Sequence, residues 1–282
     1  YRNLRKKIAD LFKSEKLQQI IQYTLVFLGG APTNTPALYS LMSHIDFNLG
    51  VWYPVGGMYK VVEALAKLGT ELGVTYQLNS PVDELVITPD ATGKGRVTGV
   101  RVGKKIYTAD IVISNADYQH TERIMSDQKY AQYGEKYWNK RTLAPSAFLM
   151  YLGVKGKLPQ LTHHNLYFGE NWMTHFEEIF TNPQWPKTPS LYLNKTTHAD
   201  PKMAPPGHET LFVLVPIASN LPETKKSKEK YADYIIKYMD EVMDLKVKDR
   251  IVFKELFSVS DFAERYNSQG GTALGLAHTL FQ

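Results

Sequence analysis

The chain has 282 residues, of which 43% are hydrophobic, enough for one large domain or two ordinary ones with a substantial core. Its formal net charge is +5, and no basic stretch interleaved with aromatic residues resembles a nucleic-acid-binding module, so nucleic acid is not an expected partner. It contains no Cys, which excludes disulfides and thiolate metal sites and fits a reducing compartment such as the cytoplasm.

The N-terminal segment is predicted to be helical. Leu4, Ile8 and Leu11 share one helical face, and Ser14 is placed to cap a second helix that is broken at Gly29-Gly30. The N-terminus runs into an amphipathic helix and not into the apolar core of a signal peptide. No apolar stretch is long enough to span a bilayer.

The segment 50–58 is an aromatic–proline turn that ends in two glycines at a helix start, where backbone can approach a partner closely. The helix beginning at Met58 is expected to end at a left-handed cap formed by Gly73. Residues 74–78 then alternate like a strand, and the apolar run 111–113 is typical of a buried parallel strand. Together these patterns predict part of an α/β nucleotide-binding domain.

The composition changes after a polar segment, 118–141, that is predicted to be helical. Strand-like runs then follow in succession, which predicts an antiparallel sheet. They cover residues 147–154, 165–168, 190–193 and 210–215. Tyr231, Ile235 and Tyr238 recur at helical spacing, so a long helix is expected after this sheet, followed by a strand at 251–253.

Several classes of site are not supported by the sequence. His163 and His164 are adjacent, and on a strand they are expected to point to opposite faces, which excludes a shared metal ion. The segment 270–275 lacks the Lys-Ser/Thr pair of a phosphate-binding loop, and the Gly-x-Gly-x-x-Gly dinucleotide fingerprint is absent. No metal site is therefore predicted.

Short motifs nevertheless occur in a distinctive order. They include Gly29-Gly30 with Pro32, Gly50-Val51-Trp52-Tyr53-Pro54 with Gly56-Gly57, Ser114-Asn115-Ala116-Asp117 and Gly271-Thr272-Ala273-Leu274-Gly275. In this order, over nearly the whole chain, they resemble the carotenoid (phytoene-type) desaturases of the flavin amine oxidase superfamily. In that family a βαβ unit with the glycine fingerprint precedes this region and a glycine-rich flavin segment follows it.

The resemblance implies a fold that combines α/β and α+β: partial FAD-binding, Rossmann-like elements with an antiparallel-sheet substrate domain flanked by helices. The expected ranges are 1–52 (helical part of the substrate domain), 53–117 (incomplete flavin domain), 118–262 (substrate sheet and helices) and 263–282 (return to the flavin domain).

The activity that the resemblance implies is FAD-dependent desaturation of a long isoprenoid such as phytoene, by a cytoplasmic protein associated peripherally with a membrane surface. FAD is expected in the complete protein but not bound to this chain alone, whose uncovered apolar surface favours self-association. The alternatives are a related flavin saturase or amine-oxidase-type enzyme, or a non-catalytic lipid-binding or interaction module.

The predicted cofactor-binding residues are Gly56 and Gly57 against the flavin ring, Val82 as a backbone contact of the adenine, and Asn115 in the Ser-Asn-Ala-Asp motif. No catalytic residue is assigned by the sequence. His44 and Asp46 precede the Trp-Tyr-Pro turn and are candidates either to face the flavin or to support residues that do.

Overall fold

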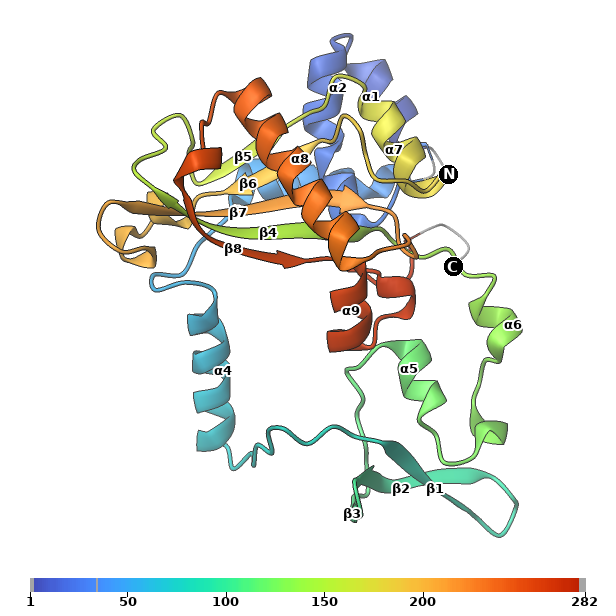
Figure 1. The fold of residues 1–282 in the computed structure, drawn as a ribbon. Coiled ribbons are helices and arrows are strands. Elements are labelled where there is room, and N and C mark those ends of the chain that lie inside the picture. The colour runs from blue at the N-terminus through green and yellow to red at the C-terminus, as the bar shows by residue number, and fades with distance from the viewer. Residues whose placement is uncertain (1–2, 34, 279–282) are drawn as a thin grey trace.

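The computed structural model describes residues 3–33 and 35–278, so residues 1–2, 34 and 279–282 of the predicted ranges lie outside the described part. A five-stranded sheet forms its centre, in the order β5-β6-β7-β4-β8 (Figure 1). All neighbouring strands are antiparallel, which confirms the prediction. The strands are β4 (Ser146–Lys155), β5 (His164–Tyr167), β6 (Leu191–Asn194), β7 (His208–Ile217) and β8 (Ile251–Phe257).

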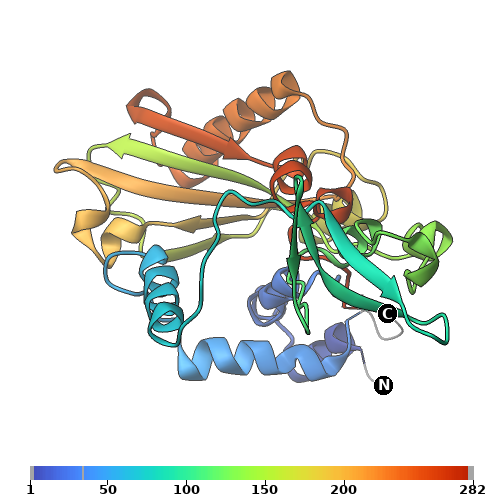
Figure 2. The same ribbon diagram turned by 90° about the horizontal axis from the view of Figure 1, so that it is seen from below.

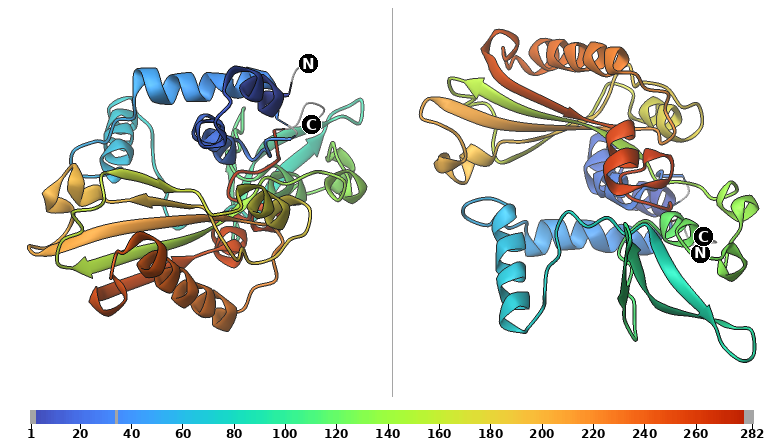
Figure 3. Two further views of the ribbon diagram at one scale, coloured as in Figure 1. Left: turned by 90° about the horizontal axis from the view of Figure 1, so that it is seen from above. Right: turned by 60° about the horizontal axis from the view of Figure 1, so that its bottom comes forward.

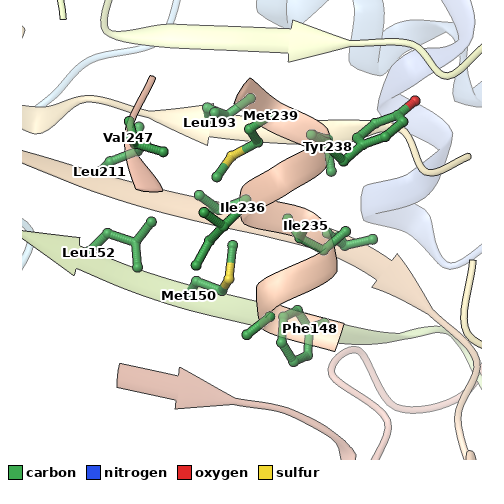
Figure 4. Close-up of a cluster of buried hydrophobic side chains, with 14 of the residues drawn as sticks. Phe148, Met150, Leu152, Leu193, Leu211, Ile235, Ile236, Tyr238, Met239 and Val247 are labelled. Atoms are coloured by element: carbon green, nitrogen blue, oxygen red, sulfur yellow. The ribbon is translucent and has the colours of Figure 1, made fainter. Parts of the chain in front are cut away.

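One face of this sheet carries the main core. Alternate side chains of the paired strands β4 and β7 point to this face, and helix α8 (Lys225–Met243) covers it (Figure 4). Phe148, Ile235 and Met239 are completely buried there. The long helix predicted from the spacing of Tyr231, Ile235 and Tyr238 is therefore confirmed.

The other face is covered by the N-terminal helices, so that the sheet lies between two helical layers (Figure 3). These helices are α1 (Leu4–Leu11), α2 (Glu15–Gln22) and α3 (Ser40–His44), with the 3-10 helices Tyr23–Leu28 and Ala37–Tyr39 and the π-helical turn Ile45–Leu49 between and after them. Leu4, Ile8 and Leu25 form a small core of their own. Helix α7 (Trp172–Phe180) and helix α9 (Val259–Tyr266) lie at one end of the sheet.

A second, three-stranded antiparallel sheet stands apart from the first (Figure 1), and Figure 2 shows it from below. It is a meander of β1 (Glu84–Pro89), β2 (Gly95–Val102) and β3 (Lys105–Thr108). Helix α4 (Tyr59–Glu71) precedes it, and the short helices α5 (Tyr118–Arg123) and α6 (Glu135–Trp138) follow it. The predicted helix over 118–141 is thus divided, with only a 3-10 turn, Gln128–Tyr130, between α5 and α6.

Two predicted strands are wrong. Residues 74–78 and 111–113 are not paired into a sheet, and the side chains of Ile111 and Ile113 are 79% and 88% exposed. A strand requires a neighbouring strand to satisfy its backbone, and no described residue supplies one for either segment. By contrast, the left-handed cap after α4 is confirmed, since Gly73 has φ +86°. The apolar face of α4 is also uncovered, with Leu65 63% exposed.

Candidate functional site

A large cavity lies on the sheet face opposite α8. Its volume is about 830 Å³, and its floor includes Tyr151, Phe212 and Phe253 from β4, β7 and β8. Phe212 pairs with Tyr151 on one side and with Asn194 on the other, so these side chains share the face. Most of the lining side chains are apolar. Such a surface suits a ligand that consists mainly of hydrocarbon.

The segment 50–58 forms one wall of the cavity, through Val51, Trp52, Tyr53 and Met58. The Tyr53 ring packs against the ring of His163 with centroids 4.7 Å apart. The Gly56 N–H donates a hydrogen bond of 2.9 Å to Oδ2 of Asp200. The close approach of this turn is therefore made to Asp200, 144 residues further along the chain.

Asp200 is held in place for this contact. Its side chain is 7% exposed and also accepts a hydrogen bond of 3.0 Å from the Lys202 N–H. The backbone hydrogen bonds from Lys202 and Gly56 lower the pKa of Asp200 below its ordinary value. The carboxylate thus serves as an anchor for the cavity wall.

Gly57 is constrained for a different reason. Its φ is +94°, and a Cβ at this position would lie 2.9 Å from Cε of Met203. Its N–H donates to the Pro54 carbonyl at 3.0 Å. A side chain at Gly57 is therefore disfavoured by the backbone conformation and by Met203, before any cofactor is considered.

We expect Asp200→Ala to release the Gly56 N–H and to raise hydrogen–deuterium exchange across residues 50–58 by about tenfold. Asp200→Asn is the matched control, because its amide oxygen can still accept the bond. Exchange that is unchanged in Asp200→Ala would show that the wall is held by other contacts.

A polar cluster interrupts the apolar lining. Nδ1 of His164 lies 2.7 Å from the Tyr192 hydroxyl, and Nδ2 of Asn194 donates to the same hydroxyl at 3.2 Å. Burial lowers the pKa of His164, against the opposing charge of Asp46, and burial raises the pKa of Tyr192. Neither Tyr192 nor Asn194 is among the site residues predicted from the sequence; both lie on β6, two residues apart, and so share this face.

The expectation that His163 and His164 point to opposite faces is wrong, because their ring centroids are only 4.4 Å apart. Strand β5 begins at His164, so strand alternation does not apply to His163. Within residues 3–33 and 35–278, no group of three or more His, Asp or Glu side chains is arranged to hold a metal ion.

The catalytic candidates His44 and Asp46 are not among the residues that line the cavity. His44 is exposed, and its Nδ1 is 3.0 Å from the amide nitrogen of Asn48. Asp46 accepts a hydrogen bond from the Tyr23 hydroxyl, and its charge acts on His164. Asp46 is thereby connected to the polar cluster, whereas His44 is not.

The predicted cofactor residues are not gathered at this cavity. Gly56 and Gly57 belong to its wall segment, but Val82 precedes β1 and the exposed Asn115 precedes α5. The Val82 N–H makes no hydrogen bond to another described residue.

Residues 1–282 match the sequence model of the flavin containing amine oxidoreductases. The chain belongs to this family. Among curated relatives, this flavin amine oxidoreductase chain is 46% identical over 275 residues to the carotenoid 3,4-desaturase of Haloarcula japonica, covering 98% of the chain and 54% of the relative. It is 29% identical over 286 residues to the zeta-carotene-forming phytoene desaturase of Myxococcus xanthus, covering 100% of the chain and 54% of the relative.

These relatives confirm the resemblance to carotenoid desaturases, and the chain spans about half of their length. Among solved structures, an oxidoreductase from Methanosarcina mazei aligns with a TM-score of 0.60 at 18% identity, covering 91% of this chain and 56% of that one. This likeness shows that the flavin amine oxidoreductase chain shares its fold with that protein.

Proposed function

We propose that this chain forms the substrate-binding part of an FAD-dependent enzyme that desaturates a long isoprenoid, a carotenoid precursor such as phytoene. The observation that carries the proposal is the apolar cavity of about 830 Å³ on the large sheet. The names of the relatives, a carotenoid 3,4-desaturase and phytoene desaturases, agree with this choice of ligand.

An isoprenoid hydrocarbon offers no polar handle, so its affinity must come from removal of apolar surface from water, at about 25 cal/mol per Å². The aromatic floor of Tyr151, Phe212 and Phe253 and the wall at Trp52 supply such a surface. Trp52 is 88% exposed. A hydrocarbon bound in the cavity would cover this ring and remove its apolar surface from water, which supports the same assignment.

FAD would supply the two-electron oxidation, so the chain itself need not provide a nucleophile. The turn at Gly56 and Gly57 does not fit a pyrophosphate, because its N–H groups already bind Asp200 and Pro54. A flat ring would reach the turn only if the side chains of Met203 and Lys60, which stand beside Gly57 and Gly56, moved away. The unpaired Val82 N–H fits an adenine acceptor.

We further propose that residues 53–117 belong to a Rossmann-like domain completed by other segments of the protein. The exposed apolar face of α4 and the unpaired runs 74–78 and 111–113 support this, because each has the pattern of an element that packs against neighbours.

Peripheral membrane association is proposed from the N-terminal surface. Leu11, Leu17 and Leu38 are exposed apolar side chains on neighbouring helices, as an interfacial surface requires. Among the described residues, none of the helices has both the length and the apolar character that crossing a bilayer demands.

The test is to incubate the complete, flavin-loaded protein with phytoene in liposomes and to follow the polyene absorbance and the products. We expect new conjugated double bonds to form, with a shift of absorbance to longer wavelength. Loss of double bonds would favour a saturase, and oxidation of amines without polyene change would favour an amine-oxidase-type enzyme. Binding without any turnover in the flavin-loaded protein would favour a lipid-binding module.

A further inference from the structure

A second, smaller cavity lies beside the first on the same sheet face. Its volume is about 40 Å³, and it is lined by Leu166, Leu214, Trp172 and Tyr23, among others. Tyr192 lines both cavities. The position of the Tyr192 side chain therefore decides whether the two cavities are separate or connected.

The strand register shows how the cavities follow one another. Asn194 pairs with Phe212 at the larger cavity, and Tyr192 pairs with Leu214 and Leu166 at the smaller one. Two residues along a strand advance about 7 Å. The two cavities therefore form successive parts of one trough that runs along β7, with the Tyr192 ring between them.

The Tyr192 ring is fixed in this position. Its hydroxyl is held by His164 and Asn194 at 2.7 and 3.2 Å, and its ring meets Phe212 edge to face with centroids 6.2 Å apart. Hydrogen bonds on one end of a side chain and ring packing on the other leave few rotamers open to it. The fixed Tyr192 ring therefore blocks passage from the larger cavity to the smaller one.

We infer that Tyr192 sets the length of hydrocarbon that the trough accepts, with the polar cluster of His164 and Asn194 holding the ring in place. The inference rests on the proposed function of the cavity as an isoprenoid site. A ligand longer than the space before Tyr192 gains no further burial, because its additional carbons meet the ring or remain in water.

The test measures the affinity of the full chain for linear isoprenoid hydrocarbons that differ by one isoprene unit, delivered in detergent micelles and followed by quenching of Trp fluorescence. The length preference is the ratio of dissociation constants for successive homologues. In the wild-type chain this ratio should fall to about one beyond the longest homologue that fits. In Tyr192→Ala it should rise about tenfold in favour of the next longer homologue.

Tyr151→Ala is the matched control, because Tyr151 lines the larger cavity and not the smaller one. It should alter affinity without shifting the length preference. Tyr192→Phe keeps the ring but removes the hydroxyl, so it should relax the preference by less than Tyr192→Ala. Tyr192→Leu replaces Tyr192→Ala if circular dichroism shows that the latter does not fold.

An unchanged length preference in a folded Tyr192→Ala or Tyr192→Leu variant would overturn the inference, as would an equal shift in Tyr151→Ala. The proposed function fails in a different way. If the wild-type chain binds none of the homologues above the micelle background, the cavity is not an isoprenoid site and the role of Tyr192 falls with it.

Discussion

Acidification from about pH 7 to about pH 4 should lower the free energy of unfolding by about 3 kcal/mol through His175 alone. This side chain is 3% exposed, and burial lowers its pKa from 6.5 to about 4. The folded chain therefore keeps His175 neutral, while the unfolded chain protonates it near 6.5. The contribution is complete above the unfolded pKa and is lost as the pH falls towards the folded one.

The hydrogen bonds of His175 define the neutral form that the fold requires. Nε2 donates to the Pro216 carbonyl at 2.9 Å, and Nδ1 accepts from the Ser190 N–H at 3.1 Å. A second proton on Nδ1 would break the bond from Ser190. His175→Gln can still donate and accept but does not titrate, so it should remove this part of the acid slope.

Denaturant unfolding at several pH values provides the measurement, and the difference between wild type and His175→Gln isolates the imidazole. The difference is needed because Glu178 acts in the opposite direction: burial raises its pKa, so protonation in the folded state favours folding at low pH. His44→Gln, at an exposed position, is the control. Equal acid slopes in all three proteins would contradict the assignment.

The large sheet was predictable because its strands find their partners within the chain. The runs around Phe148 and Val213 alternate between a core face and a cavity face, and the helix bearing Ile235 supplies the cover for the core face. The segments that pack against each other are all present in this chain. Local periodicity is then enough to predict which strands and helices form the core.

The errors occur where that condition fails. The runs 74–78 and 111–113 have the composition of strands, but the described residues contain no strands beside them. The apolar composition of a segment indicates that its side chains tend to be buried. It does not indicate whether the chain contains another segment that can pack against them. The same cause leaves Leu65 and its neighbours on α4 exposed.

The site was predictable only in part. The wall around Trp52 was identified by its unusual turn chemistry, because two glycines in succession are a local signal. The contact from Gly56 to Asp200 spans 144 residues, and no local pattern encodes it. Tyr192 lies in the predicted strand 190–193 and Asn194 directly after it, and no local pattern marks either as a site residue, since their hydrogen bonds to each other and to His164 depend on the sheet register.

Phe212→Asp should reduce isoprenoid binding by at least about a hundredfold, because it places a carboxylate on the floor of the apolar cavity. A hydrocarbon bound there would remove the water that solvates this carboxylate without replacing its hydrogen bonds. Phe212 lies on the cavity face of β7, while its neighbours Leu211 and Val213 fill the core beneath α8. Titration of the full chain with a linear isoprenoid hydrocarbon in micelles measures the loss.

Phe212→Leu is the matched control, since it shortens the apolar side chain without adding charge and should retain most of the affinity. Circular dichroism should be the same for both variants, because the core residues on either side of position 212 are unchanged. If Phe212→Asp binds as tightly as Phe212→Leu, the hydrocarbon does not lie on this floor. Conversely, affinity lost only in the charged variant places the ligand against β7, over the pair formed by Phe212 and Tyr151.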